Sequence, residues 1–556
     1  MSVIQRDFKI QEDIHPSIQA ILHKYPAVMS GIPRDGTVHR DSYCKIELLP
    51  GATSKMLRSY RLTPLERKEL DTQIDKMLEK HWIRKSTSPW ASPVLFVHKS
   101  DGGLHMCVDF RKLSAQTVPI NYPMPHPQES LDNFSGSKIS STLHLVSGFH
   151  QISIQEEDRH KTDFRGTTGL YEYTVMPLGL VNAPAIFQQA MHHALGPLCG
   201  VNGCCVVYID DIIIHSKSME EHLVHLDLVL AALSKHHYTC SPKKCAFGLS
   251  SVPYLGHIVS DKGLSPDPAK IKIINDWPVP TNLAQLRSFI GIVQYCRRFV
   301  PNIARLVAPL TMLTKKDTPF VWSDDCTSAF VRLKELVTSA PTLAMPNPKL
   351  PFQLYSDASL EGSGGVLMQN RRVVAYTGHK FSDVERRWSA TDQESYALVS
   401  NFETWRCYLE GRTDTKLYTD HQPLVWICSQ PTLPRKQTRW VLFLQRFQFT
   451  LKYVPGKLNP ADVPPRAPHL EFPAAFHDTE FISHDPVLAA ISASITNKSK
   501  RLGSATKKHV DMNFANELPP PPPRGNTLLC KFLRKCATFC TFCTFLCTCA
   551  QHECIW

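Results

Sequence analysis

Two adjacent carboxylates, Asp210 and Asp211, stand between two short apolar runs that are rich in β-branched residues. Each run is typical of a buried strand, so residues 206–214 predict a tight β-hairpin with both acids at its tip. A polar turn on a two-stranded ribbon is the simpler interpretation. However, solvated turns favour Asn-Gly or Asp-Gly, and like charges side by side cost free energy unless a cation offsets them. Clustered carboxylates that hold hard cations such as Mg²⁺ are typical of phosphoryl-transfer sites.

The charge of the chain favours a polyanionic partner. The chain has 556 residues, enough for several domains, and a formal net charge of +12. Positive charges recur along much of the chain, which suits a long groove better than one basic tail. The first residues lack the apolar core and cleavage site of a secretory signal, and no run is apolar enough to span a membrane. The sequence therefore predicts an intracellular protein of the cytoplasm, the nucleus or both.

The cysteines form two groups. Seven of the 18 crowd into residues 530–554, and the others are scattered, often within apolar segments. Scattered thiols of this kind are typical of buried, reduced cysteines in an intracellular protein. In the tail only Cys540 and Cys543 have the spacing of half a zinc site, so no zinc knuckle is predicted. The sequence also indicates no retroviral-type protease and no integrase.

Hydrophobic periodicity divides the chain into five parts. Residues 1–60 are irregular and punctuated by Pro and Gly, which predicts a leader attached to the next domain. That domain opens on a helix with Thr63 as N-cap, Pro64 at its first position and Glu66 completing a capping box. Residues 266–341 have a helical pattern. Basic residues on such helices more often form a solvated face than a nucleic-acid-binding surface. The predicted parts are a leader (1–60), a mixed domain (61–260), a helical segment (261–345), an α/β domain (346–470) and a low-complexity, Pro- and Cys-rich, disordered tail (471–556).

A second acidic set lies in the predicted α/β domain. Two strand-like segments each end on an acid, Asp357 and Asp420. Between them, a helix predicted over residues 394–409 carries Glu394 on its inward-facing apolar stripe. Taken alone, Glu394 is interpreted equally well as a solvated glutamate near a helix N-terminus. However, the two acids at the carboxyl ends of strands favour a ligand site. With Asp462, four carboxylates would repel one another unless divalent metals were bound.

Motifs along residues 45–468 occur in the order that one family shows. With them, the chain resembles the Pol polyprotein of Gypsy-type long-terminal-repeat retrotransposons, specifically its reverse transcriptase and ribonuclease H. The motifs are residues 92–95 (SPVL), 106–111 (MCVDFR), 147–151 (SGFHQ), 176–184 (MPLGLVNAP), 208–211 (YIDD), 254–257 (YLGH), 357–359 (DAS), 419–421 (TDH) and 453–457 (YVPGK).

The resemblance implies a multidomain protein of mixed α+β and α/β structure. A right-hand reverse transcriptase, with fingers and palm over residues 61–260 and a thumb and connection over 261–345, would precede a ribonuclease H-like domain. In the palm, Asp210 and Asp211 would hold catalytic metal ions and Phe149 would lie under the incoming sugar. The other residues that the resemblance implies for substrate binding are Lys99, Arg111, Tyr208, Gly256 and His257. In the second domain the implied catalytic and metal-binding residues are Asp357, Glu394, Asp420 and Asp462.

Three departures from the family pattern bear on activity. The family has Leu-Asp-Leu before the SGF motif, and its Asp is the third palm carboxylate, whereas this chain has His144 there. A neutral imidazole is a poor Mg²⁺ ligand, and a protonated one would repel the ion. His105 stands where the family has an Arg that contacts the triphosphate, and imidazole cannot reproduce a bidentate guanidinium contact. Residues 463–466 read Val-Pro-Pro-Arg in place of Ala-Leu-Ser-Arg, which is expected to perturb the setting of Asp462.

The sequence therefore predicts an RNA-directed DNA polymerase with hybrid ribonuclease H activity, and His144 places the polymerase step in doubt. The expected cofactor is Mg²⁺, with Mn²⁺ as the alternative, at two ions per active site. The expected partners are an RNA template, a DNA primer, the RNA–DNA hybrid and deoxynucleoside triphosphates, with no membrane partner and the oligomeric state left open. Two alternatives remain: a non-catalytic nucleic-acid-binding remnant of a retroelement, and ribonuclease H activity alone.

Overall fold

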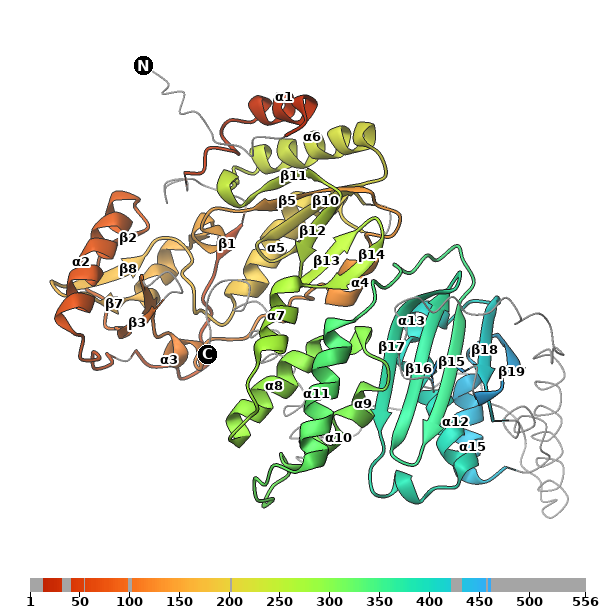
Figure 1. The fold of residues 1–556 in the computed structure, drawn as a ribbon. Helices are drawn as coiled ribbons and strands as arrows, with labels where there is room; N and C mark the ends of the chain where they lie inside the picture. Colours follow the sequence, from red (N-terminus) through yellow and green to blue (C-terminus); the bar gives the residue numbers. More distant parts are fainter. Residues whose placement is uncertain are drawn as a thin grey trace, which may run out of the picture. The chain divides into compact units, whose positions relative to one another are not determined.

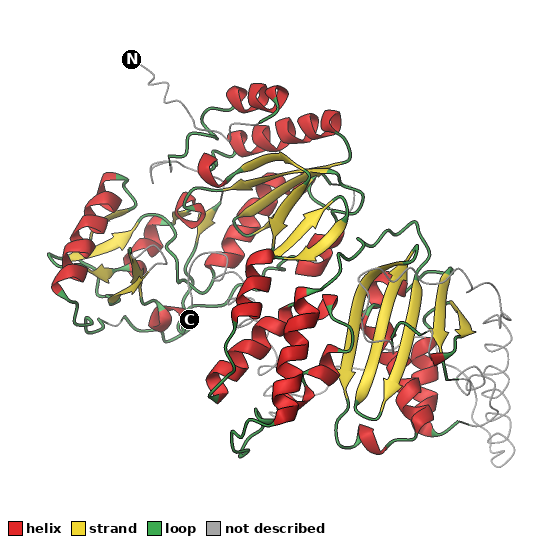
Figure 2. Ribbon diagram, viewed as in Figure 1, coloured by secondary structure: helices red, strands yellow, loops and turns green. Residues whose placement is uncertain are grey.

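The structure, a computed structural model, describes residues 14–32, 42–54, 56–98, 103–200, 203–421, 433–456 and 459–461. Its described residues fall into two compact units, and the chain passes from the first to the second within residues 255–262. Helices and strands mix in both units (Figures 1 and 2). The predicted fold class, a multidomain protein of mixed helix and sheet, is confirmed. No helix among the described residues is long and apolar enough to cross a membrane.

A four-stranded antiparallel sheet forms the centre of the first unit. Its strand order is β11-β5-β10-β9, and the antiparallel pair β9 and β10 is the hairpin predicted from the two apolar runs. Ile212, Ile213 and Ile214 are buried in β10, which explains why the run is continuously apolar. Two helices contact each other and pack against this hairpin. The elements are β5 (Ile139–His144), β9 (Cys205–Tyr208), β10 (Asp211–Ser216), β11 (Ala246–Leu249), α5 (Ala183–Leu195) and α6 (Met219–Lys235).

The leader contains a helix, so the prediction of irregular structure over its whole length was wrong. Helix α1 (Pro16–Lys24) buries Ile18, Ile21 and Leu22 and packs against α6 (Figure 1). Three apolar residues at helical spacing are enough to place the helix when a partner face is available. So short a helix is marginal alone, which is why its pattern was weak in the sequence.

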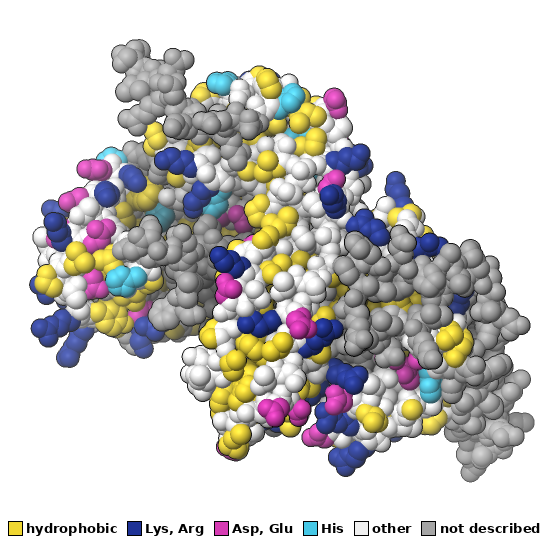
Figure 3. Space-filling model, in the orientation of Figure 1, with side chains coloured by type: hydrophobic (Ala, Val, Ile, Leu, Met, Phe, Trp, Pro, Cys, Tyr) yellow, Lys and Arg dark blue, Asp and Glu magenta, His cyan; other side chains and the backbone are white. Residues whose placement is uncertain are grey.

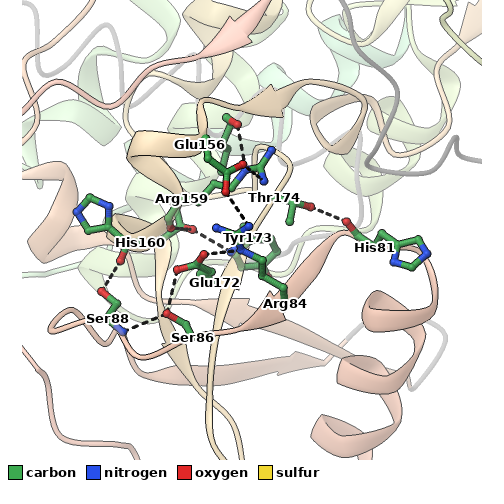
Figure 4. Close-up of polar contacts among 12 residues, drawn as sticks. His81, Arg84, Ser86, Ser88, Glu156, Arg159, His160, Glu172, Tyr173 and Thr174 are labelled. Atoms are coloured by element: carbon green, nitrogen blue, oxygen red, sulfur yellow. Dashed lines mark hydrogen bonds and ion pairs between the residues drawn. The ribbon is translucent and has the colours of Figure 1, made fainter.

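The rest of the first unit holds several small sheets, and helix α2 (Pro64–Glu79) packs against β2 and β4. Thr63 and Glu66 form the predicted capping box of α2. Arg84 bridges two acids, with its Nε 2.7 Å from Glu172 Oε1 and its Nη1 2.7 Å from Glu156 Oε1 (Figure 4). These ion pairs connect Arg84 on one strand to Glu172 on the neighbouring strand and to Glu156 on a short 3-10 helix. The elements are β1 (Tyr43–Cys44), β2 (Ile83–Lys85), β3 (Val94–His98), β4 (Leu104–Val108), α3 (Arg111–Ser114), α4 (Pro127–Asp132), η1 (Gly148–Gln151), β6 (Ser153–Ile154), η2 (Glu156–Thr162), β7 (Phe164–Arg165), β8 (Leu170–Tyr173), η3 (Gly196–Leu198), η4 (Pro242–Lys244) and β12 (Ser251–Tyr254).

Helices make up the first part of the second unit, as the periodicity of residues 266–341 predicts. They share one apolar core that includes Leu286, Phe289, Val293, Phe330 and Leu333. Strands β13 (His257–Ser260) and β14 (Gly263–Pro266) precede them along the chain. The helices are α7 (Pro268–Asp276), α8 (Leu283–Tyr295), η5 (Arg297–Phe299), α9 (Ile303–Leu306), α10 (Ala308–Met312) and α11 (Asp324–Thr338).

A five-stranded mixed sheet follows, in the order β17-β16-β15-β18-β19. Helix α12 packs against its central strands, and α15 packs against α12 (Figure 1). The parallel pairing of β15 with β18 brings the ends of two strands that are distant in sequence to one edge. The elements are β15 (Gln353–Ser359), β16 (Gly362–Gln369), β17 (Arg372–Lys380), η6 (Glu385–Arg387), α12 (Ala390–Thr404), α13 (Arg406–Leu409), β18 (Thr415–Thr419), α15 (Arg435–Leu444) and β19 (Phe449–Tyr453).

Two predicted boundaries in this sheet were wrong. Strand β15 runs past Asp357 to Ser359, because antiparallel pairing with β16 continues beyond that acid. Helix α12 begins at Ala390, with Ser389 as N-cap, and ends at Thr404, so the predicted helix over 394–409 starts too late and is interrupted. Glu394 therefore lies in the second turn of α12. It is buried there, and it is beyond the first turn, whose free N–H groups stabilise negative charge.

Candidate active sites

The hairpin turn places two acids and a histidine together in the first unit. Ile209 and Asp210 form the turn, with Ile209 at a φ of +51°, and Asp211 opens β10. Asp211 pairs in register with His144, the last residue of β5. His144 Nδ1 lies 3.7 Å from Asp211 Oδ1. We call His144, Asp210 and Asp211 the hairpin site; the departure noted in the sequence thus lies directly beside the carboxylate pair.

Gln188 holds this turn in place, and the sequence reasoning missed it. Its Oε1 accepts a hydrogen bond from Ile209 N at 2.9 Å, and its Nε2 donates to Val207 O at 3.3 Å. Gln188 is buried on α5, so a polar residue on the inward face of that helix was the available signal. The amide thus bonds one backbone group of β9 and one of the strained turn, and so holds the backbone next to the two carboxylates.

The carboxylate of Asp210 is closely packed against Gly148. A Cβ added to Gly148 would lie 2.4 Å from Asp210 Oδ1 and 3.1 Å from Phe187 Cζ, so only glycine fits opposite the carboxylate. That Oδ1 is buried and has no hydrogen-bond partner within the described part of the chain. Burial is the largest cause that raises the pKa of Asp210 to about 6; His144, the next in weight, lowers it, and the charge of Asp211 adds to the rise. An orphaned buried oxygen of this kind is what a cation would satisfy.

Replacing Gly148 by Ala should destabilise the first unit by about 1–3 kcal/mol, because the added methyl group has no space beside Asp210 and Phe187. Urea unfolding followed by intrinsic fluorescence measures the loss. Gly169→Ala is the matched control, since nothing lies within 4 Å of a Cβ there and its φ is not in the left-handed region. Equal stability of the two variants would contradict the crowding at Gly148.

The other predicted binding residues of the first unit have different settings. Phe149 lies two residues after Ser147, whose φ is +50°, and the centroid of its ring lies 5.2 Å from that of Phe187. Tyr208 is buried in β9. Arg111 is largely exposed and forms a bidentate pair with Asp109, at 2.7 and 2.8 Å, which holds the pKa of Asp109 at about 2. Lys99 lies outside the described residues.

Gly256 and His257 are packed against the helices of the second unit. Gly256 has a φ of +72°, and a Cβ there would lie 2.0 Å from Lys270 Nζ and 2.6 Å from the Tyr295 hydroxyl. The His257 ring stacks on Tyr295, with centroids 4.7 Å apart and planes inclined by 17°. Lys270 Nζ lies 3.6 Å from the centroid of the same tyrosine ring. Burial, with nearby Lys270 and Arg298, lowers the pKa of His257 to about 3, so its imidazole is neutral.

Three acids converge in the second unit. Asp357 on β15, Glu394 on α12 and Asp420 just after β18 each offer an oxygen within 4.8 Å of the others. The parallel pair β15 and β18 supplies the two aspartates at one edge, and α12 packs against β15. We call Asp357, Glu394 and Asp420 the three-acid site. Among the described residues it is the one cluster of three or more potential ligands this compact.

Burial makes the three-acid site electrostatically unfavourable without a cation. Glu394 Oε1 accepts from Ala358 N at 3.1 Å, while Glu394 Oε2 and Asp420 Oδ1 are buried with no hydrogen-bond partner among the residues that the structure describes. Burial, then the charges of Asp357 and Asp420, raises the pKa of Glu394 to about 8. The buried glutamate differs from the wet residue of the alternative interpretation. Three converging carboxylates, two of which have a buried oxygen without a partner among the described residues, are a fitting donor set for a hard divalent ion.

Several supporting residues escaped the sequence reasoning. A Cβ at Gly456 would lie 2.8 Å from Asp420 Oδ2, so any larger residue there would push against that carboxylate. Asn459 Nδ2 donates to Ser356 O at 3.1 Å, and Asn302 Nδ2 donates to Ala461 O at 2.8 Å. These bonds anchor the chain up to the residue before Asp462. Asp462 itself lies outside the described residues.

The raised pKa of Glu394 predicts a pH dependence of stability without metal. Between its unfolded pKa near 4.5 and about 8, the folded state keeps a proton that the unfolded state releases, so stability falls as pH rises through this window. We expect the thermal midpoint in EDTA to fall from pH 5 to 8. In Glu394→Gln this slope should be shallower. Identical slopes in the parent and the variant would contradict the assignment.

Two family models match the chain. The model described as reverse transcriptase (RNA-dependent DNA polymerase) matches residues 97–259, and the RNase H-like domain found in reverse transcriptase matches residues 347–447. The first match includes the hairpin site and the second includes the three-acid site. The chain therefore contains a reverse transcriptase domain and a ribonuclease H-like domain. Domains of these two kinds generally depend on divalent metal ions.

The curated relatives that the chain matches are polyproteins of retrotransposons. The chain is 37% identical over 408 residues to the Pol polyprotein from transposon 297 of Drosophila melanogaster, covering 72% of this chain and 38% of the relative. It is 35% identical over 411 residues to the Tf2-3 polyprotein of Schizosaccharomyces pombe, covering 72% of this chain and 31% of the relative. The resemblance to Gypsy-type Pol polyproteins is confirmed. The chain spans less than half the length of these relatives.

Solved structures share the fold. A foamy viral protease–reverse transcriptase in complex with double-stranded DNA matches with a TM-score of 0.70 at 23% identity, over 80% of this chain and 95% of that one. The same viral protein in complex with an RNA/DNA hybrid matches with a TM-score of 0.67 at 20% identity, over 85% of this chain and 63% of that one. The chain thus shares the multidomain fold, of mixed helix and sheet, with these reverse transcriptase structures.

The two sites differ in how well they fit a magnesium ion. The three-acid site of the ribonuclease H-like domain offers only oxygens, and two of them are buried without partners in the described structure. The hairpin site of the reverse transcriptase domain offers two carboxylates and an imidazole. Hard Mg²⁺ prefers the first donor set. The replacement at residue 144 therefore weakens the fit of the hairpin site to this ion.

Proposed function

We propose that this chain acts on nucleic acids as the reverse transcriptase and ribonuclease H part of a retrotransposon, with cleavage of the RNA strand of an RNA–DNA hybrid as its better-supported activity. The observation that carries the proposal is the convergence of Asp357, Glu394 and Asp420, in which Glu394 Oε2 and Asp420 Oδ1 are buried without a hydrogen-bond partner among the described residues. Such a cluster is stable at neutral pH only with bound cations or a retained proton. The foamy viral neighbours in complex with nucleic acid support RNA–DNA hybrid and DNA as ligands.

The residues of the three-acid site have separable roles. Asp357 and Asp420 would hold divalent ions, and Glu394 would be fixed by its bond to Ala358 N, with its second oxygen free for an ion. Divalent ions held by these carboxylates would supply a polarised water as nucleophile and would stabilise charge on the leaving oxygen. Asp462, just beyond the anchored Ala461, is proposed as the fourth carboxylate. His421, next to Asp420 in the chain, has its Nε2 3.3 Å from Thr391 Oγ1, and burial lowers its pKa while the charge of Asp420 opposes that shift.

Polymerisation is the second proposed activity, and the hairpin site limits it. Asp210 and Asp211 would hold the ions for attack of a primer 3′-hydroxyl on a deoxynucleoside triphosphate, and Phe149 would lie under its sugar. His144 supplies an imidazole where the family pattern has a carboxylate, which favours weak polymerisation with Mg²⁺. His105 on β4 removes the guanidinium that would contact the triphosphate.

Both activities are tested on one purified sample of the full chain. We expect Mg²⁺-dependent cleavage of the RNA in a labelled hybrid and primer extension on an RNA template close to background. Cleavage with full extension would contradict the proposed limit at His144. Neither activity, in a protein that still binds hybrid, would instead favour a non-catalytic nucleic-acid-binding remnant.

A further inference from the structure

Two thiols of the first unit lie in contact at the start of β9. Cys199 directly follows η3 and Cys205 opens β9, and their Sγ atoms are 3.4 Å apart. Their backbones pair as in a parallel sheet. Neighbouring strands lie about 4.8 Å apart, which is within the Cα separation of about 4.4–6.8 Å that disulfides have. The two sulfurs therefore need only move from contact distance to bonding distance.

The backbone around this pair holds the two segments together. Cys204 N donates a hydrogen bond to Leu198 O at 2.9 Å, and Cys199 N donates to Gly196 O at 3.1 Å. A Cβ added to Gly203 would lie 2.5 Å from Leu198 O, so the two segments approach this closely because the residue has no side chain. The thiol contact is thus fixed by the fold on both sides.

The two thiols differ in exposure and in acidity. Cys199 is partly exposed, whereas Cys205 is buried. The hydrogen bond with Cys205 lowers the pKa of the Cys199 thiol, while burial opposes that shift. Its contacts with Cys199 and Cys204, followed by burial, raise the pKa of the Cys205 thiol. Because the thiolate is the form that attacks oxidants, Cys199 has the properties of a nucleophile and Cys205 those of its resolving partner.

We propose that Cys199 and Cys205 form a modification site, at which hydrogen peroxide closes a reversible disulfide. The Cys199 thiolate attacks one peroxide oxygen, the O–O bond breaks, and the departing hydroxide takes up a proton and leaves as water. Cys199 then carries a sulfenic acid. The Cys205 sulfur attacks the Cys199 sulfur, the S–O bond breaks, and the hydroxyl group leaves with the Cys205 proton as a second water. In total, the two thiols lose two electrons and two protons, and the peroxide becomes two waters.

Two other thiol contacts are poorer candidates for this reaction. Cys204 also contacts Cys205, but a disulfide between adjacent residues closes a small ring that strains the planar trans peptide between them. Cys240 contacts Cys245, but both are buried, with exposed fractions of 0% and 7%. Cys240 and Cys245 therefore provide an internal control, because they make the same kind of contact away from solvent.

The experiment treats the reduced full chain with a small excess of hydrogen peroxide. The remaining thiols are blocked in denaturant with one alkylating reagent, the protein is reduced, and the released thiols are alkylated with a second reagent. Fragment masses of the peptides should place the second reagent on Cys199 and Cys205 and the first on Cys204. The fraction of second reagent at Cys199 should exceed that at Cys240 on the order of tenfold. A dithiol reductant added before blocking should abolish it at the pair.

Two variants identify the nucleophile. In Cys205→Ser, oxidation of Cys199 should stop at the sulfenic acid, which dimedone traps, whereas Cys199→Ser should leave Cys205 reduced. Cys204→Ser is the matched control and should form the disulfide as the parent does. Circular dichroism before oxidation shows that each variant is folded.

The second reagent on Cys204, or linkage of Cys199 to any thiol other than Cys205, would overturn the proposal. A folded parent chain in which Cys199 and Cys205 are oxidised no more than Cys240 would do the same. These readouts need neither hybrid cleavage nor primer extension, so the inference is independent of the proposed function.

Discussion

Asp357→Asn should lower the rate of hybrid cleavage by at least about 10²-fold. Asp357 is one of three acids whose oxygens lie within 4.8 Å of one another. A neutral amide in its place would bind a divalent ion less strongly and would remove a negative charge that holds the ions stabilising the transition state. Cleavage of a hybrid with labelled RNA, measured over a range of Mg²⁺ concentrations, gives the rate. The variant should remain inactive at concentrations that saturate the parent.

The control for this prediction is Asp383→Asn, an exposed acid in the same unit. It should cleave at the parental rate. Asp357→Asn should also fold at least as well as the parent in EDTA, because the charge of Asp357 raises the pKa of Glu394 and its removal relieves repulsion. Cleavage that survives Asp357→Asn, with folding intact, would refute the assignment of the three-acid site.

His144→Asp should raise primer extension with Mg²⁺ by about 10²-fold over the parent. The new carboxylate would restore an oxygen ligand directly opposite Asp211, at the end of the same β5–β10 register. Extension of a labelled DNA primer on an RNA template measures the gain. Because His105 would still lack a guanidinium, the recovery should be partial, and His105→Arg added to His144→Asp should increase it further.

The matched control for this gain is His144→Asn, which has a similar size but no charge and should not restore extension. A robust rate in the unmodified chain would contradict the view that His144 limits the polymerase. If extension stays at background in His144→Asp while the hybrid is still cleaved, the defect must lie elsewhere in the reverse transcriptase domain.

Surface charge indicates less about function than the hairpin site and the three-acid site do. In Figure 3, lysine and arginine side chains are interspersed with acidic ones on the face shown. That view shows no single basic stripe among the described residues. The net charge of +12 therefore supports nonspecific attraction to a polyanion but identifies no binding face.

Local patterns in the sequence predicted local structure well. The hairpin of β9 and β10, the capping box of α2 and the helical run from residue 266 each depend on contacts between near neighbours. The predicted end of a strand was wrong where pairing with another strand extends it. At Asp357, pairing with β16 continues β15 beyond the predicted end. Helix α1 was missed because its stability comes from packing on α6.

The residues that support the sites could not be found from the sequence in the same way. Gln188 is an ordinary polar residue until α5 brings it to the turn at Ile209. Gly148 and Gly456 are ordinary glycines until a carboxylate lies where a Cβ would be. Each of these roles is a matter of a few ångströms between segments that are distant along the chain.

The sequence alone determined which family the two domains resemble, which acids are candidates for catalysis and where His144 departs from the pattern, because motif identity is local. Only the tertiary structure decided that Asp357, Glu394 and Asp420 converge and that His144 faces Asp211 at 3.7 Å. The physical reason is that strand register and helix packing set distances between remote residues, and burial then sets their electrostatics. The hairpin of Asp210 and Asp211 is thus an element that the sequence predicts but whose chemistry depends on the strand beside it.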